Sequence, residues 1–276
     1  MNSEFQTRFV YLSCFLGFTT NSFLLYFILT DKSKNHNGYK RILGIITLYN
    51  LYYGLVHAVT DMGFLLEKDG FVMFSKRMQS YGFWASYLAT MPSPERNRVS
   101  RENLLRKYNV SIENLGYLGP LYMITNDNGN TKILWKNLVG SIGCLGLLGV
   151  FYTAICLFGL KLFLFIRSSL VSERTKRMNY QLMRLFLIQA VVPLFFEYVP
   201  CFTNVAAGPL DFPYYEEIGY YQPIFVSLYP FIDSTMVFVG FRDYRNRILS
   251  SKPIQSLRNL KRSRIFTSRS GSQFQN

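Results

Sequence analysis

Long runs with almost no charged residues dominate the hydrophobic pattern of this chain. Five runs extend over 19 to 24 residues with at most one charge each, and they place Phe, Leu, Ile or Val on every side of a helix. A helix of about 20 residues crosses the hydrocarbon core of a bilayer. Five such runs predict an all-α fold, a polytopic transmembrane helix bundle. The predicted spans are residues 9–30, 42–66, 137–166, 185–208 and 218–241.

The segments between the predicted spans differ in charge. Three of them are basic, whereas the connection 209–217 holds three acids and no base. Because short cytoplasmic loops carry an excess of Lys and Arg, this bias predicts an N-terminus outside and a C-terminus inside the cell. The predicted cytoplasmic segments are 31–41, 167–184 and 242–276, and the predicted outside segments are 1–8, 67–136 and 209–217.

The long segment 67–136 is basic as well, but long loops cross membranes largely regardless of their charge. It contains the sequon Asn109-Val110-Ser111, which an outside placement would expose to the lumenal transferase. The sequence therefore predicts N-glycosylation at Asn109.

The composition narrows the class of function. The net charge is +14, and 18 of the 30 Lys and Arg fall in the three predicted cytoplasmic segments, where they face anionic lipid headgroups. The charge thus indicates a membrane surface and no nucleic-acid partner. The two His and four Cys form no metal-ligand or nucleophile motif. The sequence predicts that the chain is not an enzyme and holds no metal or cofactor.

Glycine recurs at every third position from Gly140 to Gly149 within the predicted span 137–166. Small residues in a membrane helix let the backbone of a neighbouring helix approach closely. This stripe predicts helix packing along that face.

The last two predicted spans each carry one acid, Glu197 and Asp233. An ionisable group at membrane depth is costly and usually faces the interior of the bundle. At 1.5 Å per residue, Glu197 lies near the middle of the membrane and Asp233 lies in its cytoplasmic third. Both acids are therefore candidate functional residues.

Prolines stand next to both acids. Pro193 and Pro200 flank Glu197, and Pro230 precedes Asp233 by about one turn. A proline inside a helix removes a backbone hydrogen bond and kinks the helix. One interpretation is a conformational switch made of two kinked spans. The other is two static kinks, each with one hydrogen-bonded acid.

Several motifs in these spans are specific. They are Val192–Pro200 (VPLFFEYVP), Tyr229–Asp233 (YPFID) and the ending Phe241–Arg245 (FRDYR), with weaker matches at 21–40 and 108–129. With these motifs the chain resembles the nematode seven-transmembrane chemoreceptors of the Str class and its relative Srj.

The resemblance implies a G-protein-coupled-type olfactory receptor that detects a small-molecule odorant and signals through a heterotrimeric G protein. The resemblance also implies a location in the plasma membrane, and more narrowly in the ciliary membrane of chemosensory neurons. The residues that would face the G protein are Arg174, Lys176, Arg177, Arg242 and Arg245.

One departure from the family is large, because the family has seven spans and the sequence predicts five. Colinear matching places the missing third and fourth spans between the second predicted span and Tyr108. The apolar stretch 78–91 has 14 residues, fewer than the roughly 17 that a crossing requires. We interpret it as an interfacial segment or as the remnant of a deleted helix. The sequence thus predicts a truncated receptor, active or inactive, or an incorrectly spliced gene model.

The alternative function is a secondary transporter or ion pathway that uses Glu197 and Asp233 as a proton or cation relay. Inverted repeats between the halves of the chain would support it, and the sequence shows none.

Overall fold

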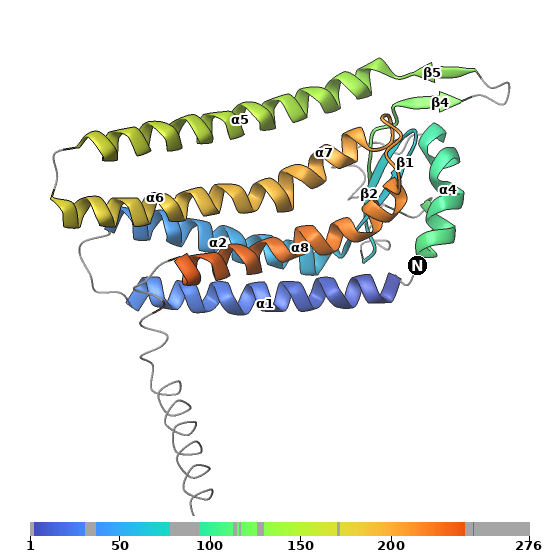
Figure 1. Cartoon of the computed structure of the whole chain (residues 1–276). Coiled ribbons are helices and arrows are strands. Elements are labelled where there is room, and N and C mark those ends of the chain that lie inside the picture. Colours follow the sequence, from blue (N-terminus) through green and yellow to red (C-terminus); the bar gives the residue numbers. More distant parts are fainter. Residues whose placement is uncertain are drawn as a thin grey trace, which may run out of the picture.

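Five long apolar helices run alongside one another, and a small cap lies at one end of them (Figure 1). The computed structural model describes residues 3–30, 37–77, 94–112, 115, 117–125, 130–169, 172–240 and 245. The long helices are α1 (Ser3–Thr30), α2 (Asn37–Thr60), α5 (Trp135–Ser168), α6 (Glu173–Pro193) continued by α7 (Val199–Ala206), and α8 (Tyr215–Gly240). Five helical stretches of the described chain are long and apolar enough to cross a membrane, which confirms the predicted helix bundle.

Two helix ends differ from the predicted boundaries. The second span was expected to extend to residue 66, but α2 ends at Thr60, and Asp61 adopts a φ of +42°. The following residues form strand β1 (Met62–Glu67). The prediction missed this strand because a short apolar run alone does not distinguish a strand from a buried helix. The predicted loop 167–184 is also largely helical, since α6 begins at Glu173. The stretch 78–91 lies outside the described residues.

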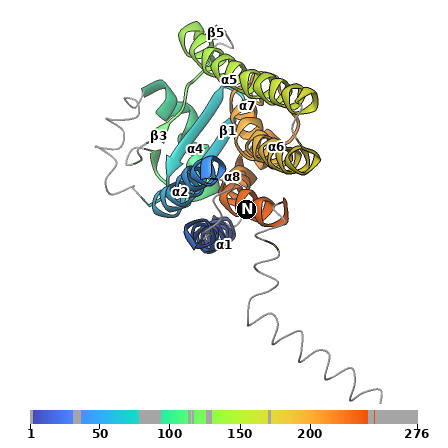
Figure 2. The same ribbon diagram turned by 90° about the vertical axis from the view of Figure 1, so that its left-hand side faces the viewer.

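The helices form an open arc when viewed end-on (Figure 2). The pairs that pack most closely are α1 with α8, α1 with α2, α6 with α8, and α5 with α6, and α2 also touches α8. In Figure 2 the two ends of the arc, α2 and α5, stand apart. α8 is therefore the central helix, with α1 and α2 on one side and α5 to α7 on the other.

The two sides of the arc are buried to different degrees. In the most apolar stretch of each helix, 44% of the residues are buried in α8, 33% in α1 and 28% in α2, but 17% in α6–α7 and none in α5. In lipid, close van der Waals packing and interhelical hydrogen bonds hold helices together, and both increase with contact between them. Helices α1, α2 and α8, which we call the anchored unit, thus form the firm part of the bundle.

The predicted packing along the glycine stripe of α5 does not occur within the described residues. A Cβ atom added at Gly140, Gly143, Gly146 or Gly149 would have no described atom within 4 Å. The contacting side of α5 is a different one, where Gly159 meets Leu187 of α6. Sequence spacing finds a small-residue face, but it does not tell which face meets a neighbour.

The cap is a folded unit that the sequence did not predict. Strands β1, β2 (Gly70–Ser75) and β3 (Tyr117–Leu118) form an antiparallel sheet in the order β1-β2-β3, and helix α4 (Pro94–Tyr108) packs on it. Nine buried residues of the cap form one hydrophobic cluster, namely Leu65, Val72, Phe74, Leu104, Tyr108, Val110, Ile112, Leu115 and Tyr117. A separate ribbon of β4 (Met123–Thr125) and β5 (Thr131–Ile133) leads from the cap into α5.

The crossing of α1 and α8 depends on Gly17. A Cβ at this position would lie 3.2 Å from the Cβ of Pro230 and 3.3 Å from the backbone nitrogen of Phe231. We expect Gly17→Ala to cost about 1–2 kcal/mol, because the helices must separate to make room. The measurement is the thermal unfolding midpoint of the protein in detergent.

Gly44→Ala is the matched control, because a Cβ at Gly44 meets no described atom within 4 Å. It should leave the midpoint unchanged or raise it, since alanine favours a helix by up to about 1 kcal/mol over glycine. Equal losses in both variants would contradict a close crossing at Gly17.

Candidate functional site

A buried polar junction joins the three helices of the anchored unit. The Asn50 Nδ2 atom of α2 donates to the Asp233 Oδ2 atom of α8 at 2.8 Å and lies 3.3 Å from the Asn21 Oδ1 atom of α1. All three side chains are at most 2% exposed. Polar side chains at helix contacts in a membrane hold the helices in one register, because lipid offers them no partner.

The same junction contacts α8 at Pro230. The Asn21 Nδ2 atom donates to the carbonyl oxygens of Pro230 and Gly17, at 2.8 Å in both cases. One residue beyond Asp233, the Ser234 hydroxyl donates to Thr20 Oγ1 at 2.7 Å. Helix α8 is therefore bonded to α1 on both sides of Asp233, at Pro230 and at Ser234.

The second acid lies where the helix is irregular. Pro193 ends α6, residues Leu194–Tyr198 form a single π-helical turn, and α7 follows with Pro200 near its start. Such π-helical turns are rare and frequently occur at functional sites. Glu197 lies inside the turn. Its Oε1 atom is buried and has no hydrogen-bond partner among the described residues.

Helix α7 is tied to α8 close to this turn. The Gln222 Nε2 atom donates to the Pro200 carbonyl at 3.0 Å, and the Thr203 hydroxyl donates to the same oxygen at 2.8 Å. Both proline-kinked segments thus have a buried carbonyl that a side chain of a neighbouring helix satisfies.

An aromatic cluster joins α2 and α8. The Tyr53 ring lies 4.5 Å from the His57 ring and 5.5 Å from the Tyr229 ring, centroid to centroid. The charge of Glu197 acts on Tyr53 and Tyr229, and the charge of Asp233 acts on Glu197. The fold therefore brings the two predicted acids into one electrostatic environment, although their estimated depths differ.

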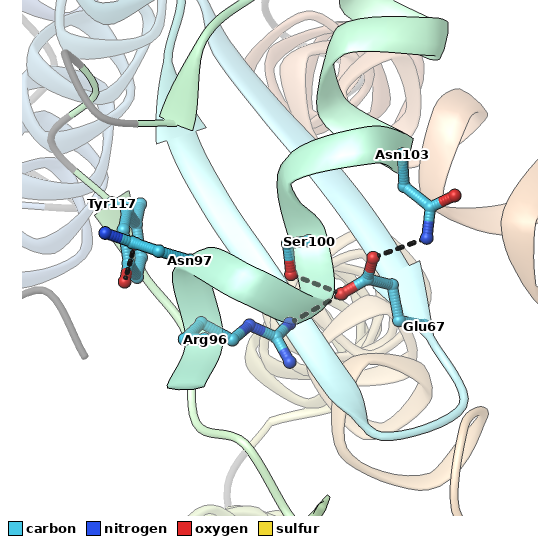
Figure 3. Close-up of polar contacts among 6 residues, drawn as sticks. All are labelled: Glu67, Arg96, Asn97, Ser100, Asn103 and Tyr117. Carbon is cyan, nitrogen blue, oxygen red and sulfur yellow. Dashed lines mark hydrogen bonds and ion pairs between the residues drawn. The ribbon is translucent and has the colours of Figure 1, made fainter. Parts of the chain in front are cut away.

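The cap contains a second polar cluster, centred on Glu67 at the end of β1 (Figure 3). Three side chains of α4 converge on this carboxylate: Arg96 Nη2 at 3.3 Å, Ser100 Oγ at 2.5 Å and Asn103 Nδ2 at 2.7 Å. Burial lowers the pKa of Arg96, and the Glu67 carboxylate opposes this shift. The cluster fixes α4 on the sheet, because these positions lie on one face of the helix.

A third set of polar contacts joins the cap to the bundle. Lys76 Nζ donates to Gln6 Oε1 at 2.6 Å, and Gln6 Nε2 donates to the Tyr220 carbonyl at 2.6 Å. Burial lowers the pKa of Lys76, and nearby Asp61 opposes this shift. Gly208, between α7 and α8, lies so close to the Glu67 carbonyl oxygen that a Cβ would collide with it. The cap therefore contacts the ends of both α1 and α8.

The structure describes the predicted G-protein-facing residues only in part. Arg174 and Arg177 lie in α6, and Lys176 Nζ lies 3.7 Å from Glu173 Oε1. Arg245 is exposed, and Arg242 lies outside the described residues. These residues remain predictions.

Sequence analysis singled out Pro193, Glu197, Pro200, Pro230 and Asp233 and missed their partners. Asn21, Asn50, Gln222 and Ser234 carry no charge, so a search for ionisable groups inside the spans passes over them. The available signal was an amide in an otherwise apolar run, which is costly in lipid unless it has a partner. No group of three or more His, Cys, Asp or Glu side chains that could hold a metal ion occurs in the described part of the chain.

The bundle and its buried polar junction define a multi-span helical membrane protein, and comparison with known sequences gives its family. A family model described as serpentine type 7TM GPCR chemoreceptor Str matches residues 6–85 and 78–249. The chain belongs to this family of serpentine chemoreceptors, which confirms the resemblance seen in the last two spans.

Two relatives match almost the whole chain. Serpentine receptor class J-38 of Caenorhabditis elegans is 20% identical over 305 residues, covering 86% of this chain and 90% of the relative. Serpentine receptor class r-10 of Caenorhabditis briggsae is 18% identical over 315 residues, covering 90% of this chain and 92% of the relative. No solved structure matches the chain significantly.

Proposed function

We propose that this protein detects a small molecule and signals through a heterotrimeric G protein from the plasma membrane of a chemosensory cell. Membership in a chemoreceptor family supports the receptor class. The observation that carries the mechanism is the unequal construction of the bundle. The polar junction clamps α8 to α1 and α2, whereas α6–α7 is broken by two prolines and a π-helical turn and is buried much less.

In this mechanism the anchored unit stays fixed and α5–α7 moves against it. A ligand shifts the balance between two arrangements only if it binds one of them more tightly. The π-helical turn around Glu197 is the natural point of bending, because its backbone is already irregular there. Movement at this turn would reposition Arg174, Lys176 and Arg177, which lie in the first turns of α6 and would face the G protein.

We further propose that the chain lacks the third and fourth spans of its family. The family model matches in two pieces that meet at residues 78–85, and both relatives align over more positions than this chain has residues. The arc is open between α2 and α5, the helices on either side of the break. Loss of two helices preserves the orientation of every later helix, so the basic connections stay on one side of the membrane.

A cell reporter tests the proposal. The full chain, tagged at both ends, is expressed with a promiscuous G protein and a calcium reporter, and a panel of volatile compounds is applied. A matched chimaera carries the corresponding segment of the class J-38 relative in place of residues 78–93. We expect an N-terminal tag accessible on intact cells and a ligand-evoked signal from the chimaera. The same signal from the native chain would show that the shortened form is active. Surface expression without a signal from either protein would refute G-protein coupling.

The transporter alternative has one observation in its favour, which is the electrostatic coupling of Glu197 to Asp233. Glu197→Gln and Asp233→Asn distinguish the two functions. Loss of substrate-driven proton flux in these variants would favour a transporter, whereas loss of the agonist-evoked signal would favour a receptor.

Glycosylation tests the proposed orientation of the cap. Asn109 directly follows α4, is exposed and has a φ of +55°, and Ser111 is exposed as well. We expect the protein from eukaryotic cells to gain mobility on gels after treatment with an N-glycosidase. Asn109→Gln and Ser111→Ala should abolish this change. An unmodified wild-type protein at the cell surface would contradict an outside cap with an accessible sequon.

A further inference from the structure

The cap and the bundle have separate hydrophobic cores. Among the described residues, one buried hydrophobic cluster lies wholly in the cap, and two others lie wholly among the long helices. None of these three clusters contains residues of both parts. A part of a chain that has its own core can move relative to the rest and keep its fold, unless a large hydrophobic interface prevents it.

Strand β1 makes the apolar contact between the two parts. Leu66 is 1% exposed and lies against Gly219 of α8, where an added Cβ would be 3.1 Å from the Leu66 Cγ atom. The preceding residue, Leu65, belongs to the core of the cap. Because successive side chains of a strand point to opposite faces, β1 rests on α8 through one face only.

An ion pair crosses the same boundary. Lys107 at the end of α4 places its Nζ atom 2.6 Å from the Oε2 atom of Glu216 in the first turn of α8, and the two side chains are 15% and 41% exposed. The Nζ atom is buried, and no other acceptor in the described part of the chain meets it. A buried ammonium is costly without a counter-charge. The closed position of the cap therefore depends on Glu216.

A second ion pair across the boundary is weaker. Lys68 Nζ lies 4.0 Å from Asp211 Oδ1, and the two side chains are 64% and 71% exposed. Water screens such a pair, so it contributes little.

The chain itself joins the cap to other helices. It enters the cap at Asp61, directly after α2, where φ is +42°, and it leaves through the β4–β5 ribbon into α5. Helix α8 has no direct chain connection to the cap. The attachments to α2 and α5 thus persist when the contacts with α8 break.

We propose that the cap is a lid that opens as a folded unit, and that the ion pair Lys107–Glu216 is the latch that holds it on the start of α8. Opening frees the first turns of α8, the central helix of the bundle, from β1 and α4. This inference does not depend on the proposed receptor function, because it concerns only how two parts of the chain hold together.

Two cysteine reporters in the full-length protein test the proposal. Leu66→Cys places a thiol between the cap and α8, and Leu104→Cys places one in the core of the cap, where Leu104 is 0% exposed. Each protein is held in lipid nanodiscs, and labelling by a water-soluble maleimide is followed by mass spectrometry. The wild type gives the background from its four native cysteines. Opening uncovers position 66 alone, so we expect position 66 to be labelled at least about tenfold faster than position 104.

Changes at the latch should act on position 66. Glu216→Gln should speed labelling there about threefold to tenfold, because it leaves the Lys107 ammonium buried without a counter-charge. The double change Lys107→Met with Glu216→Gln should return the rate most of the way to its original value. Glu217→Gln is the matched control, since Glu217 is an exposed acid one residue further along, and it should change the rate less than about twofold.

A change in the core of the cap separates opening from unfolding. Val72→Ala creates a cavity in the cap cluster and should speed labelling at position 104 about tenfold or more, but not at position 66. If Leu66→Cys fails to fold, Gln6→Cys reports on the same interface, because Gln6 is 0% exposed and bonds to Lys76 of the cap and to Tyr220 of α8.

Three results would overturn the proposal. Equal labelling rates at positions 66 and 104 that rise together in Val72→Ala would mean that the cap opens only by unfolding. Labelling at position 66 no faster than the wild-type background would mean that the cap stays closed. An unchanged rate in Glu216→Gln would mean that the ion pair is not the latch.

Discussion

Arg96→Met should be among the most destabilising single changes in the described part of the protein, costing about 3–5 kcal/mol. The side chains of Arg96 and Glu67 are 1% and 6% exposed, so loss of the guanidinium leaves a buried carboxylate without its counter-charge. Ser100 and Asn103 would still donate to Glu67, but they are neutral and cannot replace the charge. The expected result is an unfolded cap, measured as rapid cleavage of the segment 62–122 by protease added to the cap side of reconstituted protein.

The control changes another residue of the same helix, and the reversal changes both partners of the ion pair. Arg98→Met changes an exposed arginine of the same helix and should be silent within about 0.5 kcal/mol. The double change Glu67→Gln with Arg96→Met should recover most of the loss, because removing both partners of a buried pair costs far less than removing one. A protease pattern equal to that of the wild type in Arg96→Met alone would show that the ion pair does not hold the cap together.

Asn50→Leu should have the second large effect. It removes the amide that donates to Asp233 and leaves that carboxylate with no donor among the described residues. A buried acceptor that loses its partner costs about 1–3 kcal/mol. We expect a loss of about 2 kcal/mol in thermal unfolding. If the junction holds α8 in the receptor, the ligand-evoked signal should be lost as well.

Tyr52→Leu is the matched control for Asn50→Leu, since Tyr52 lies on the exposed side of α2 at 65% exposure. The double change Asn50→Leu with Asp233→Leu should recover stability but not signalling. A loss no larger than about 0.6 kcal/mol, the average for ordinary hydrogen bonds between membrane helices, would contradict a structural role for the junction.

The cap, the polar junction and the π-helical turn have separate tasks in the proposed mechanism. The cap is held by its own ion pair and by its contacts to the ends of α1 and α8, so its stability depends on the anchored unit as well. The junction at Asp233 joins the three helices of that unit from inside, and in the proposed mechanism the opposite side of the arc bends at the π-helical turn. A signal would then pass from the ligand to the start of α6 through the broken helix.

The sequence predicted the bundle because its signal is local and strong. A run of about 20 apolar residues can be stable in lipid only as a helix, whatever the rest of the chain does. For the same reason it singled out Glu197 and Asp233, since an acid in such a run needs a partner. The family resemblance likewise rested on short motifs, each of which is contiguous in the sequence.

Local sequence patterns could not predict the cap or the polar junction. Strand β1 looks like the end of a membrane helix, because the apolar run before it continues beyond Asp61 into residues 62–66. Asn21, Asn50 and Asp233 lie on three different helices, and their contacts extend over 29 and 183 residues of sequence. No spacing rule within one helix joins them.

The number of long apolar helices in the described chain thus followed from the sequence alone, because the cost of a charge or an unpaired backbone group in lipid is decided residue by residue. Only the tertiary structure decided which faces of those helices meet. It also decided that the glycine face of α5 meets no described residue and that two acids of different depth share one environment. Packing depends on all neighbours at once, and a hydrogen bond between helices exists only when the fold brings both partners to the same place.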